Sequence, residues 1–471
     1  MALTGLVQET SLHQRASGRS LPVQLYWEIR TNILSGKLPR GSRVPASRDM
    51  ASLYGVSRGT VVTAYEQLIA ERYLQARKGT GTFVSIKLPE TLPQGAYKSR
   101  ALPPPQKEHE RPFCFHEPAL RSFPMDVWAR VAASRLRRVP TEMLAGGDAF
   151  GYAPLREAVV DYLHRSRGVV CRPEQVVITS GTNQSLDLVL RTILRPEEAV
   201  WMEDPGYPGA VAALRNAGAR VVPVRVDELG LDPRHGVRQD PAATAVYLTP
   251  ARQFPLGMTM PLERRLAVIQ WARQARAYIL EDDYDSEFRY DGKPVPAMQG
   301  LDPSGRVILM GSFNVTLFPA LRLAYMVIPE TLIDPVRTTR AALDRFPPTL
   351  EQAVLCDFLT DGHFSRHLRQ MRMLYGARLE TLRTASDRYL KGAVSLPDIH
   401  SGLHIPAHLT GVADARVVED RASKQGLDVC ALQRFQIRRR DINALLLGFA
   451  AFEERVIREG VRKLAAVIEG R

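Results

Sequence analysis

Small and polar residues follow a short apolar segment near the middle of the chain, where they could bind an anion. The segment 175–179 runs into Ser180-Gly181-Thr182-Asn183 and then into a helical pattern over 184–194. A small-residue turn between a strand and a helix presents free backbone N–H groups, and these groups and the helix dipole both favour a phosphate. The turn therefore predicts an anion cradle, although such turns are common and this one needs further support.

Four further apolar segments end in polar or aromatic residues. These ends are Glu203 to Pro208, Thr249 to Gly257, Glu281 to Asp285, and Gly311 to Arg322. Apolar segments alternate with helical patterns from Phe113 onward, which predicts an α/β domain with a largely parallel sheet. In such a sheet ligands bind at the carboxyl ends of the strands. The sequence thus predicts one ligand site along one edge of the sheet.

A second kind of chemistry is indicated near the N-terminus, where short helical patterns follow one another closely. One helix is expected from Leu21 to Gly36, a second over 49–54, and a third after Ser57, whose side chain can cap it. Two strand segments around the turn 78–81 complete a hairpin. Helix, glycine turn, helix and hairpin make a winged helix-turn-helix, which places its recognition helix in the major groove of DNA.

Five residues of this module are expected to contact DNA. Ser57, Arg58 and Thr60 stand at the start of the recognition helix, where side chains reach base edges. Arg48 and Lys78 are placed to neutralise backbone phosphates. The first hundred residues hold 14 Lys or Arg against 6 Asp or Glu, so they carry +8 of the net charge of +13. A basic module with these motifs points to double-stranded DNA as the partner.

Composition and length set the remaining bounds. A chain of 471 residues is expected to hold several domains: a tail over 1–20, the winged helix over 21–87, a proline-rich linker over 88–112, and the α/β domain over 113–471, with a small subdomain from about residue 370. Neither a membrane-spanning run nor a signal peptide is recognisable. The four cysteines are scattered, so reduced thiols in the cytoplasm are expected and a metal site is not.

The N-terminal segment resembles the GntR-type winged helix. Three motifs of that family recur in order, as Val44-Pro45-Ala46-Ser47-Arg48, as Tyr54 to Val61, and as Gly79-Thr80-Gly81-Thr82-Phe83-Val84. Arg72 is a departure, because the family usually has glycine before the wing.

Over residues 21–470 the chain is similar to the MocR-type regulators, in which this winged helix is fused to a domain like the fold-type I, class I/II aminotransferases. The segments Glu281 to Tyr290 and Leu317 to Arg322 carry that resemblance. It implies a multidomain fold, a winged helix-turn-helix plus an α/β domain like the pyridoxal-phosphate-dependent transferases. It also implies a homodimer formed through the aminotransferase-like domains.

The resemblance assigns a phosphate site. Ser180, Gly181 and Thr182 would hold the phosphate of pyridoxal phosphate. Arg322 would pair with it through its two-pronged guanidinium.

The resemblance also assigns contacts to the cofactor ring. Tyr207 would stack on the ring, and Asp282 would pair with its nitrogen and keep it protonated. Tyr284, with Gln253 as a further candidate, would hydrogen-bond the ring hydroxyl. A plainer interpretation stays open, in which these residues serve the fold alone and Asp282 caps a helix or pairs with an arginine.

The residue that makes the resembled family enzymatic is missing. The family motif Gly-Ser-Phe-Ser-Lys-Thr-Leu carries the Schiff-base lysine, and this chain has Asn314 and Val315 at its Ser-Lys positions. A valine can neither bond the cofactor nor move a proton during transamination. Further departures surround it: Arg252 for His, Leu256 for Thr, Ala324 for Gly, and Leu446 to Phe449 where many aminotransferases carry a substrate-binding arginine.

Few other lysines could substitute. After the linker the chain has only Lys293, Lys391, Lys424 and Lys463, and the family often has a lysine at the Lys293 position without using it for the Schiff base. Pyridoxal phosphate is therefore expected to bind only non-covalently, if it binds, and the effector is unknown. We expect a DNA-binding transcriptional regulator whose aminotransferase-like domain is inactive and serves as ligand sensor and dimerisation scaffold. Two alternatives stay open: an aminotransferase-type enzyme using another lysine, and an architectural regulator with an empty pocket.

Overall fold

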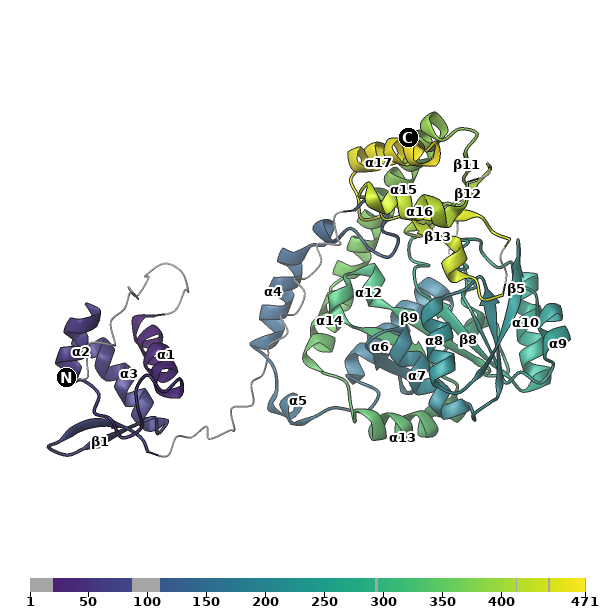
Figure 1. The fold of residues 1–471 in the computed structure, drawn as a ribbon. Helices are drawn as coiled ribbons and strands as arrows, with labels where there is room; N and C mark the ends of the chain where they lie inside the picture. Colours follow the sequence, from purple (N-terminus) through teal and green to yellow (C-terminus); the bar gives the residue numbers. More distant parts are fainter. Residues whose placement is uncertain (1–19, 87–110, 293–294, 412, 439–440, 471) are drawn as a thin grey trace. The chain divides into compact units, whose positions relative to one another are not determined.

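The computed structural model describes residues 20–86, 111–292, 295–411, 413–438 and 441–470 (Figure 1). The chain forms two compact units, residues 1–106 and 107–471. The expected tail and linker fall outside the described residues, apart from Ser20, Arg111 and Pro112.

The first unit is the predicted winged helix-turn-helix. Gly55 takes a left-handed conformation (φ 62°) and ends the second helix, and the Ser57 hydroxyl accepts a hydrogen bond from the Thr60 N–H at 3.1 Å, which caps the third. Arg72 keeps the turn that usually carries glycine by adopting a φ of 64° itself. The elements are α1 (Leu21–Leu34), α2 (Ser47–Tyr54), α3 (Arg58–Ala70), β1 (Leu74–Arg77) and β2 (Gly81–Val84).

The second unit is built on an eight-stranded sheet. Its strands β9, β8, β7, β4 and β5 are parallel neighbours, and β10 lies antiparallel between β3 and β9. The predicted α/β class is therefore confirmed. The strand order is β3 (Val176–Thr179), β10 (Ala324–Val327), β9 (Val307–Ser312), β8 (Tyr278–Asp283), β7 (Ala245–Leu248), β4 (Ala199–Asp204), β5 (Arg220–Asp227) and β6 (Gly230–Leu231).

Helices cover both faces of this sheet (Figure 1). In β4, Val200 and Met202 join the core beneath α7 (Thr182–Ile193), α8 (Pro208–Asn216) and α13 (Ile333–Leu343). Ala199 and Trp201 face the opposite core, under α10 (Leu262–Ala275) and α11 (Met298–Leu301). Burial on both faces explains why the sequences of these strands are continuous apolar runs. The remaining helices of this part are α4 (Met125–Leu136), α5 (Thr141–Ala145), α6 (Ala153–Arg167), α9 (Pro233–Gln239), α12 (Phe313–Thr316) and α14 (Leu350–Thr360).

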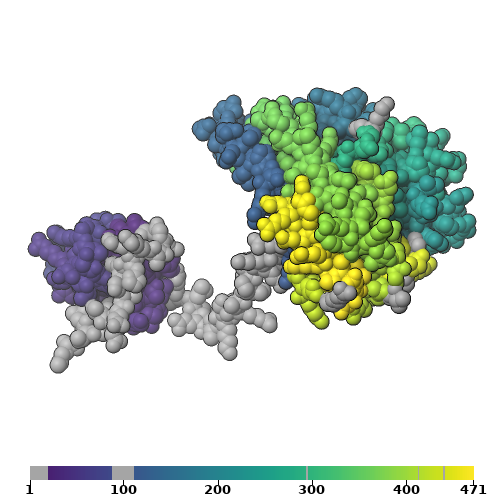
Figure 2. Space-filling view, turned by 90° about the horizontal axis from the view of Figure 1, so that it is seen from above, coloured from purple at the N-terminus to yellow at the C-terminus, as the bar shows by residue number. Residues whose placement is uncertain are grey.

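A small subdomain closes the second unit. Its four-stranded antiparallel sheet has the order β11 (Val394–Ser395), β12 (His404–Leu409), β14 (Ala444–Gly448) and β13 (Cys430–Ala431). The helices beside it are α15 (His363–Tyr389), α16 (Ala415–Lys424) and α17 (Glu454–Ile468). Its C-terminal residues, yellow in Figure 2, gather on one side of the unit. No helix in the described part of the chain is long and apolar enough to cross a membrane.

Candidate ligand site

A cavity of about 260 Å³ opens at the carboxyl ends of the central strands. It lies where the sequence predicted a site, and the small subdomain contributes to its wall. Its lining residues are Phe115, His116, Gly181, Thr182, Asn183, Tyr207, Tyr247, Thr249, Phe254, Asp282, Tyr284, Asp285, Ser312, Asn314, Val315, Arg322, Leu403 and His404.

One end of the cavity is formed by the turn that the sequence predicts to be an anion cradle. Helix α7 begins at Thr182, two residues earlier than predicted, so its first N–H groups belong to the turn itself. A Cβ placed on Gly181 would lie 3.4 Å from a guanidinium nitrogen of Arg322 and 3.4 Å from Nδ2 of Asn314. Asn314 is held in place, because its Nδ2 donates to the Ser180 carbonyl (3.1 Å) and its Oδ1 accepts from the Leu323 N–H (3.0 Å). The absent side chain of Gly181 leaves this space to a ligand.

The middle of the cavity presents a carboxylate. Oδ2 of Asp282 accepts a hydrogen bond from the Tyr247 hydroxyl at 2.6 Å. Oδ1 is buried and has no partner at normal hydrogen-bond geometry among the described groups. Burial raises the pKa of Asp282 to about 7, and the side chains of Tyr247 and Thr182 lower it. A buried acceptor without a partner is costly, so Oδ1 is suited to a ligand that brings a donor.

Aromatic side chains form the walls. The Phe254 ring packs edge-on against Tyr207 (5.8 Å between centroids), Tyr284 (5.9 Å) and His404 (5.7 Å). Burial raises the pKa of Tyr207, the Asp282 charge raises it further, and the Arg322 charge lowers it. Tyr207 thus lies within the electrostatic reach of both charged groups, and a flat ring between cradle and carboxylate would lie beside it.

Val315 completes the wall near the cradle. It lies in the short helix α12, and its side chain packs against the main core. No lysine occurs among the residues that line the cavity. Lys391, Lys424 and Lys463 are exposed elsewhere, and Lys293 lies outside the described residues.

Comparison with known proteins decides the family. Residues 21–84 match the bacterial regulatory proteins of the gntR family, and residues 121–394 match the class I and II aminotransferases. Over 461 residues the chain is 36% identical to the probable rhizopine catabolism regulatory protein MocR of Rhizobium meliloti, covering 94% of this chain and 92% of the relative. The chain belongs to the MocR-type regulators.

Other relatives agree with this assignment. The pyridoxine biosynthesis transcriptional regulator PdxR of Corynebacterium glutamicum is 32% identical over 93% of this chain and 94% of its own. Among solved structures, the α-aminoadipate aminotransferase LysN of Thermus thermophilus, complexed with N-(5'-phosphopyridoxyl)-L-leucine, superposes with a TM-score of 0.70 at 29% identity, covering 76% of this chain and 92% of that one. This MocR-type regulator is therefore a DNA-binding transcriptional regulator with an aminotransferase-like domain.

The structure of this MocR-type regulator brings most of the predicted ligand residues together. Those that line the cavity are Gly181, Thr182, Tyr207, Asp282, Tyr284, Asn314, Val315 and Arg322. Ser180 does not line the cavity, because its carbonyl accepts from Asn314 and its N–H donates to the Gln184 side chain at 2.7 Å. The structure corrects the assignment of Gln253, whose buried amide donates to the Pro205 and Phe254 carbonyls and accepts from the Leu256 N–H. That side chain holds its own loop and does not line the cavity.

Of the 18 lining residues, ten were not named as site residues from the sequence, and three of these ten form an aromatic wall. Phe115 follows the linker directly, and no motif marks it. Phe254 lies inside a segment that the sequence marks as a strand end, but no motif singles it out. His404 belongs to the small subdomain, and only the tertiary fold brings it to the sheet edge. Aromatic walls of this kind have no spacing that a sequence alone reveals.

The predicted DNA-contacting residues of the MocR-type regulator lie on the recognition elements. Arg48, Arg58 and Lys78 are exposed on α2, on α3 and in the hairpin turn. Ser57 and Thr60 hydrogen-bond one another through their hydroxyls at 2.9 Å. These two residues therefore shape the start of the helix, while the arginines and the lysine stay available to DNA.

One grouping of metal-type donors occurs at the start of the second unit. Donor atoms of Cys114, His116 and Glu117 lie within 4.8 Å of one another. Sγ of Cys114 lies 3.7 and 3.6 Å from the two ring nitrogens of His116. Three donors are one fewer than a structural zinc site uses, so this group alone does not make such a site.

Proposed function

We propose that this regulator binds a phosphorylated pyridoxal-type ligand in the cavity without a covalent bond and does not transaminate. The observation that carries the proposal is Val315 in the wall of a cavity that still has its anion cradle and its unpartnered carboxylate oxygen. Ligand binding would then act on DNA binding, which is the established role of the family.

The residues present fit pyridoxal phosphate. The phosphate would lie at the cradle of Gly181, Thr182 and Arg322, and the ring would lie beside Tyr207 with its protonated nitrogen donating to Oδ1 of Asp282. The volume of about 260 Å³ is just below the range for drug-sized ligands, so it suits one phosphorylated ring. The similarity to LysN, solved with a phosphopyridoxyl ligand, supports the same choice.

Bound pyridoxal phosphate supplies an electron-accepting ring, which lysine-bearing enzymes use to labilise bonds of an amino acid. In this chain the cradle would bind and orient that ring, and Asp282 would hold a proton at its nitrogen. Val315 offers no nitrogen for attachment and no group to carry a proton. The cavity is thereby suited to recognition rather than to turnover.

We also propose a homodimer. Four large apolar side chains are exposed between residues 120 and 144: Leu120, Met125, Leu136 and Leu144, exposed by 43%, 57%, 54% and 68%. Such a concentration on one short segment favours a protein interface. Two winged helices would then read two DNA half-sites.

Calorimetric titration of the full-length protein with pyridoxal phosphate tests the ligand proposal. We expect one ligand per protomer, and no transfer of amino groups from any common amino acid to 2-oxoglutarate above a heat-denatured control. Measurable turnover would establish an enzyme instead. Absence of binding would favour an architectural regulator with an empty pocket.

A further inference from the structure

Arg252 is a buried cation that the ligand site described above does not use. It follows β7, and its side chain is only 2% exposed. A charge taken out of water is destabilising unless partners surround it. The partners of Arg252 come from both subdomains.

The guanidinium bridges the two subdomains. On the large subdomain, one of its terminal nitrogens donates to the Tyr284 hydroxyl (2.7 Å) and to Oδ2 of Asp285 (3.0 Å). On the small subdomain, the same nitrogen lies 3.0 Å from Nε2 of His404, and the other donates to the His404 carbonyl. Arg252 thus contacts residues of both subdomains, at the boundary between their two sheets.

The joint is packed so closely that two glycines are required. A Cβ on Gly402 (φ 79°) would lie 2.1 Å from Nε of Arg252, and a Cβ on Gly257 (φ 85°) would lie 2.7 Å from the Ile399 side chain. Backbone bonds run beside them, from the Gly402 N–H to the Phe288 carbonyl (2.7 Å) and from the Tyr290 N–H to the His400 carbonyl (2.9 Å). We call residues 252–257, 284–290 and 399–404 the seam.

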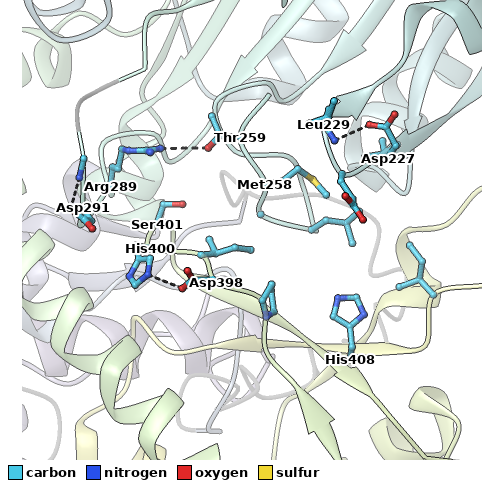
Figure 3. A pocket seen from close by; sticks show the side chains of 18 of the residues that line it. Asp227, Leu229, Met258, Thr259, Arg289, Asp291, Asp398, His400, Ser401 and His408 are labelled. Atoms are coloured by element: carbon cyan, nitrogen blue, oxygen red, sulfur yellow. Dashed lines mark hydrogen bonds and ion pairs between the residues drawn. The ribbon is translucent and has the colours of Figure 1, made fainter. Parts of the chain in front are cut away.

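The seam separates two cavities. The ligand cavity lies on one side, with Tyr284 and His404 in its wall. A cavity of about 1310 Å³ lies on the other side, between the 256–259 loop and the 397–401 segment (Figure 3). Asp398 and His400 hydrogen-bond each other in its small-subdomain wall, while Thr259 and Arg289 face it from the large subdomain (Figure 3). Movement at the seam would change the shape of both cavities.

Arg252 also acts on two ligand-facing groups, Tyr284 and His404. The Tyr284 oxygen accepts from the guanidinium, so its own O–H remains to donate into the cavity. Nε2 of His404 lies 3.0 Å from the same nitrogen, and the guanidinium charge favours the neutral imidazole. Burial and the Arg252 charge hold the pKa of His404 well below its usual range. The remaining O–H of Tyr284 therefore favours a ligand atom that accepts a hydrogen bond.

We infer that Arg252 is a positioning residue that couples occupancy of the ligand cavity to the docking of the small subdomain. A ligand that accepts from Tyr284 engages the hydroxyl that Arg252 holds, so binding stiffens the seam. Loss of Arg252 loosens the seam and lowers the affinity for the ligand. The coupling rests on the ligand site proposed above, whereas the role of Arg252 in the seam does not.

Hydrogen exchange of the full-length protein without ligand tests the seam. In Arg252→Gln we expect amides of 288–290 and 402–409 to exchange at least tenfold faster, with β4 and β7 unchanged and Arg252→Lys intermediate. The matched control is Arg340→Gln. That arginine is equally buried, pairs with Asp344, and lies on α13 away from the cavity. Unchanged exchange in Arg252→Gln, or the same pattern in both variants, would overturn the inference.

Exchange with pyridoxal phosphate as the probe tests the coupling. We expect the ligand to slow exchange over 402–409 in the wild type and to leave it unchanged in Arg252→Gln, whose affinity falls at least tenfold. Equal slowing in both proteins would refute the coupling. If the wild type binds no pyridoxal phosphate, the proposed ligand is wrong, while the ligand-free experiment still decides whether Arg252 holds the seam.

Discussion

Asp282 lies at the centre of the cavity, and its Oδ1 has no partner among the described groups. Asp282→Asn should keep the contact with Tyr247 but lose the charge that a protonated ring nitrogen requires. Hydrogen bonds to charged groups contribute about 1.5–3 kcal/mol, so we expect pyridoxal phosphate to bind about ten- to a hundredfold more weakly in calorimetry. Asp204→Asn is the control, because Asp204 bonds the N–H groups of Ile437 and Arg438 and does not line the cavity. An equal loss in both variants would exclude a specific role for Asp282.

Val315 stands at the position of the Schiff-base lysine, so a substitution here distinguishes covalent chemistry from ligand recognition. Val315→Lys would put an amine beside the cradle, and we expect borohydride to attach a pyridoxyl group to it when pyridoxal phosphate is present. The control Val315→Ile should take up no such group. Failure of Val315→Lys to react would mean that the surrounding groups no longer hold the ring in place.

Glu203 is a buried carboxyl group whose protonation should make the stability of the protein depend on pH. Burial raises its pKa to about 8, although the Thr249 N–H and hydroxyl both donate to Oε2. The folded protein therefore keeps a proton on Glu203 that the unfolded chain releases. The contribution of Glu203 to the free energy of unfolding is fully present below about pH 4.5 and is lost as the pH rises through 8. Against Glu203→Gln, the wild type should lose up to about 1.4 kcal/mol per pH unit over this window. Urea unfolding at pH 5 to 8 measures the difference, and a constant difference would contradict it.

At the scale of elements, the cap of the recognition helix is the most direct test of the first unit. Removing the N-cap hydrogen bond in Ser57→Ala should cost about 1 kcal/mol, or about 4–8 °C in the melting temperature of a domain of this size. The control Ser35→Ala removes an exposed hydroxyl beyond the end of α1. Scanning calorimetry of the full chain measures both, and equal shifts would mean that the cap does not stabilise the helix.

Elements were also the level at which sequence reasoning worked best. Glycine at position 55, serine at 57 and the apolar strands identify their structures through local chemistry, and each lies where it was expected. The cavity was predicted only in part. The α/β pattern implies that the strand ends lie along one sheet edge. Phe115 and His404 belong to segments far away in the sequence, so this pattern did not predict them. Gln253 carries a suitable amide, yet the amide bonds to its own loop and does not line the cavity.

At the scale of the whole molecule, the exposed apolar segment predicts association. We expect sedimentation velocity to find a dimer at micromolar concentration. The double variant Met125→Glu, Leu144→Glu should weaken it at least tenfold, because charges would enter an apolar contact. Met373→Glu, on an equally exposed side chain of α15, should leave the dimer intact. A monomeric wild type would contradict the proposal.

The central claim is that the second unit binds its ligand without reacting with it. Native and denaturing mass spectra of the full-length protein, mixed with pyridoxal phosphate and treated with borohydride, test this most directly. The account predicts one ligand mass per protomer in the native spectrum and the bare chain after denaturation. A pyridoxyl group that survives denaturation, or a native spectrum without ligand, would contradict it.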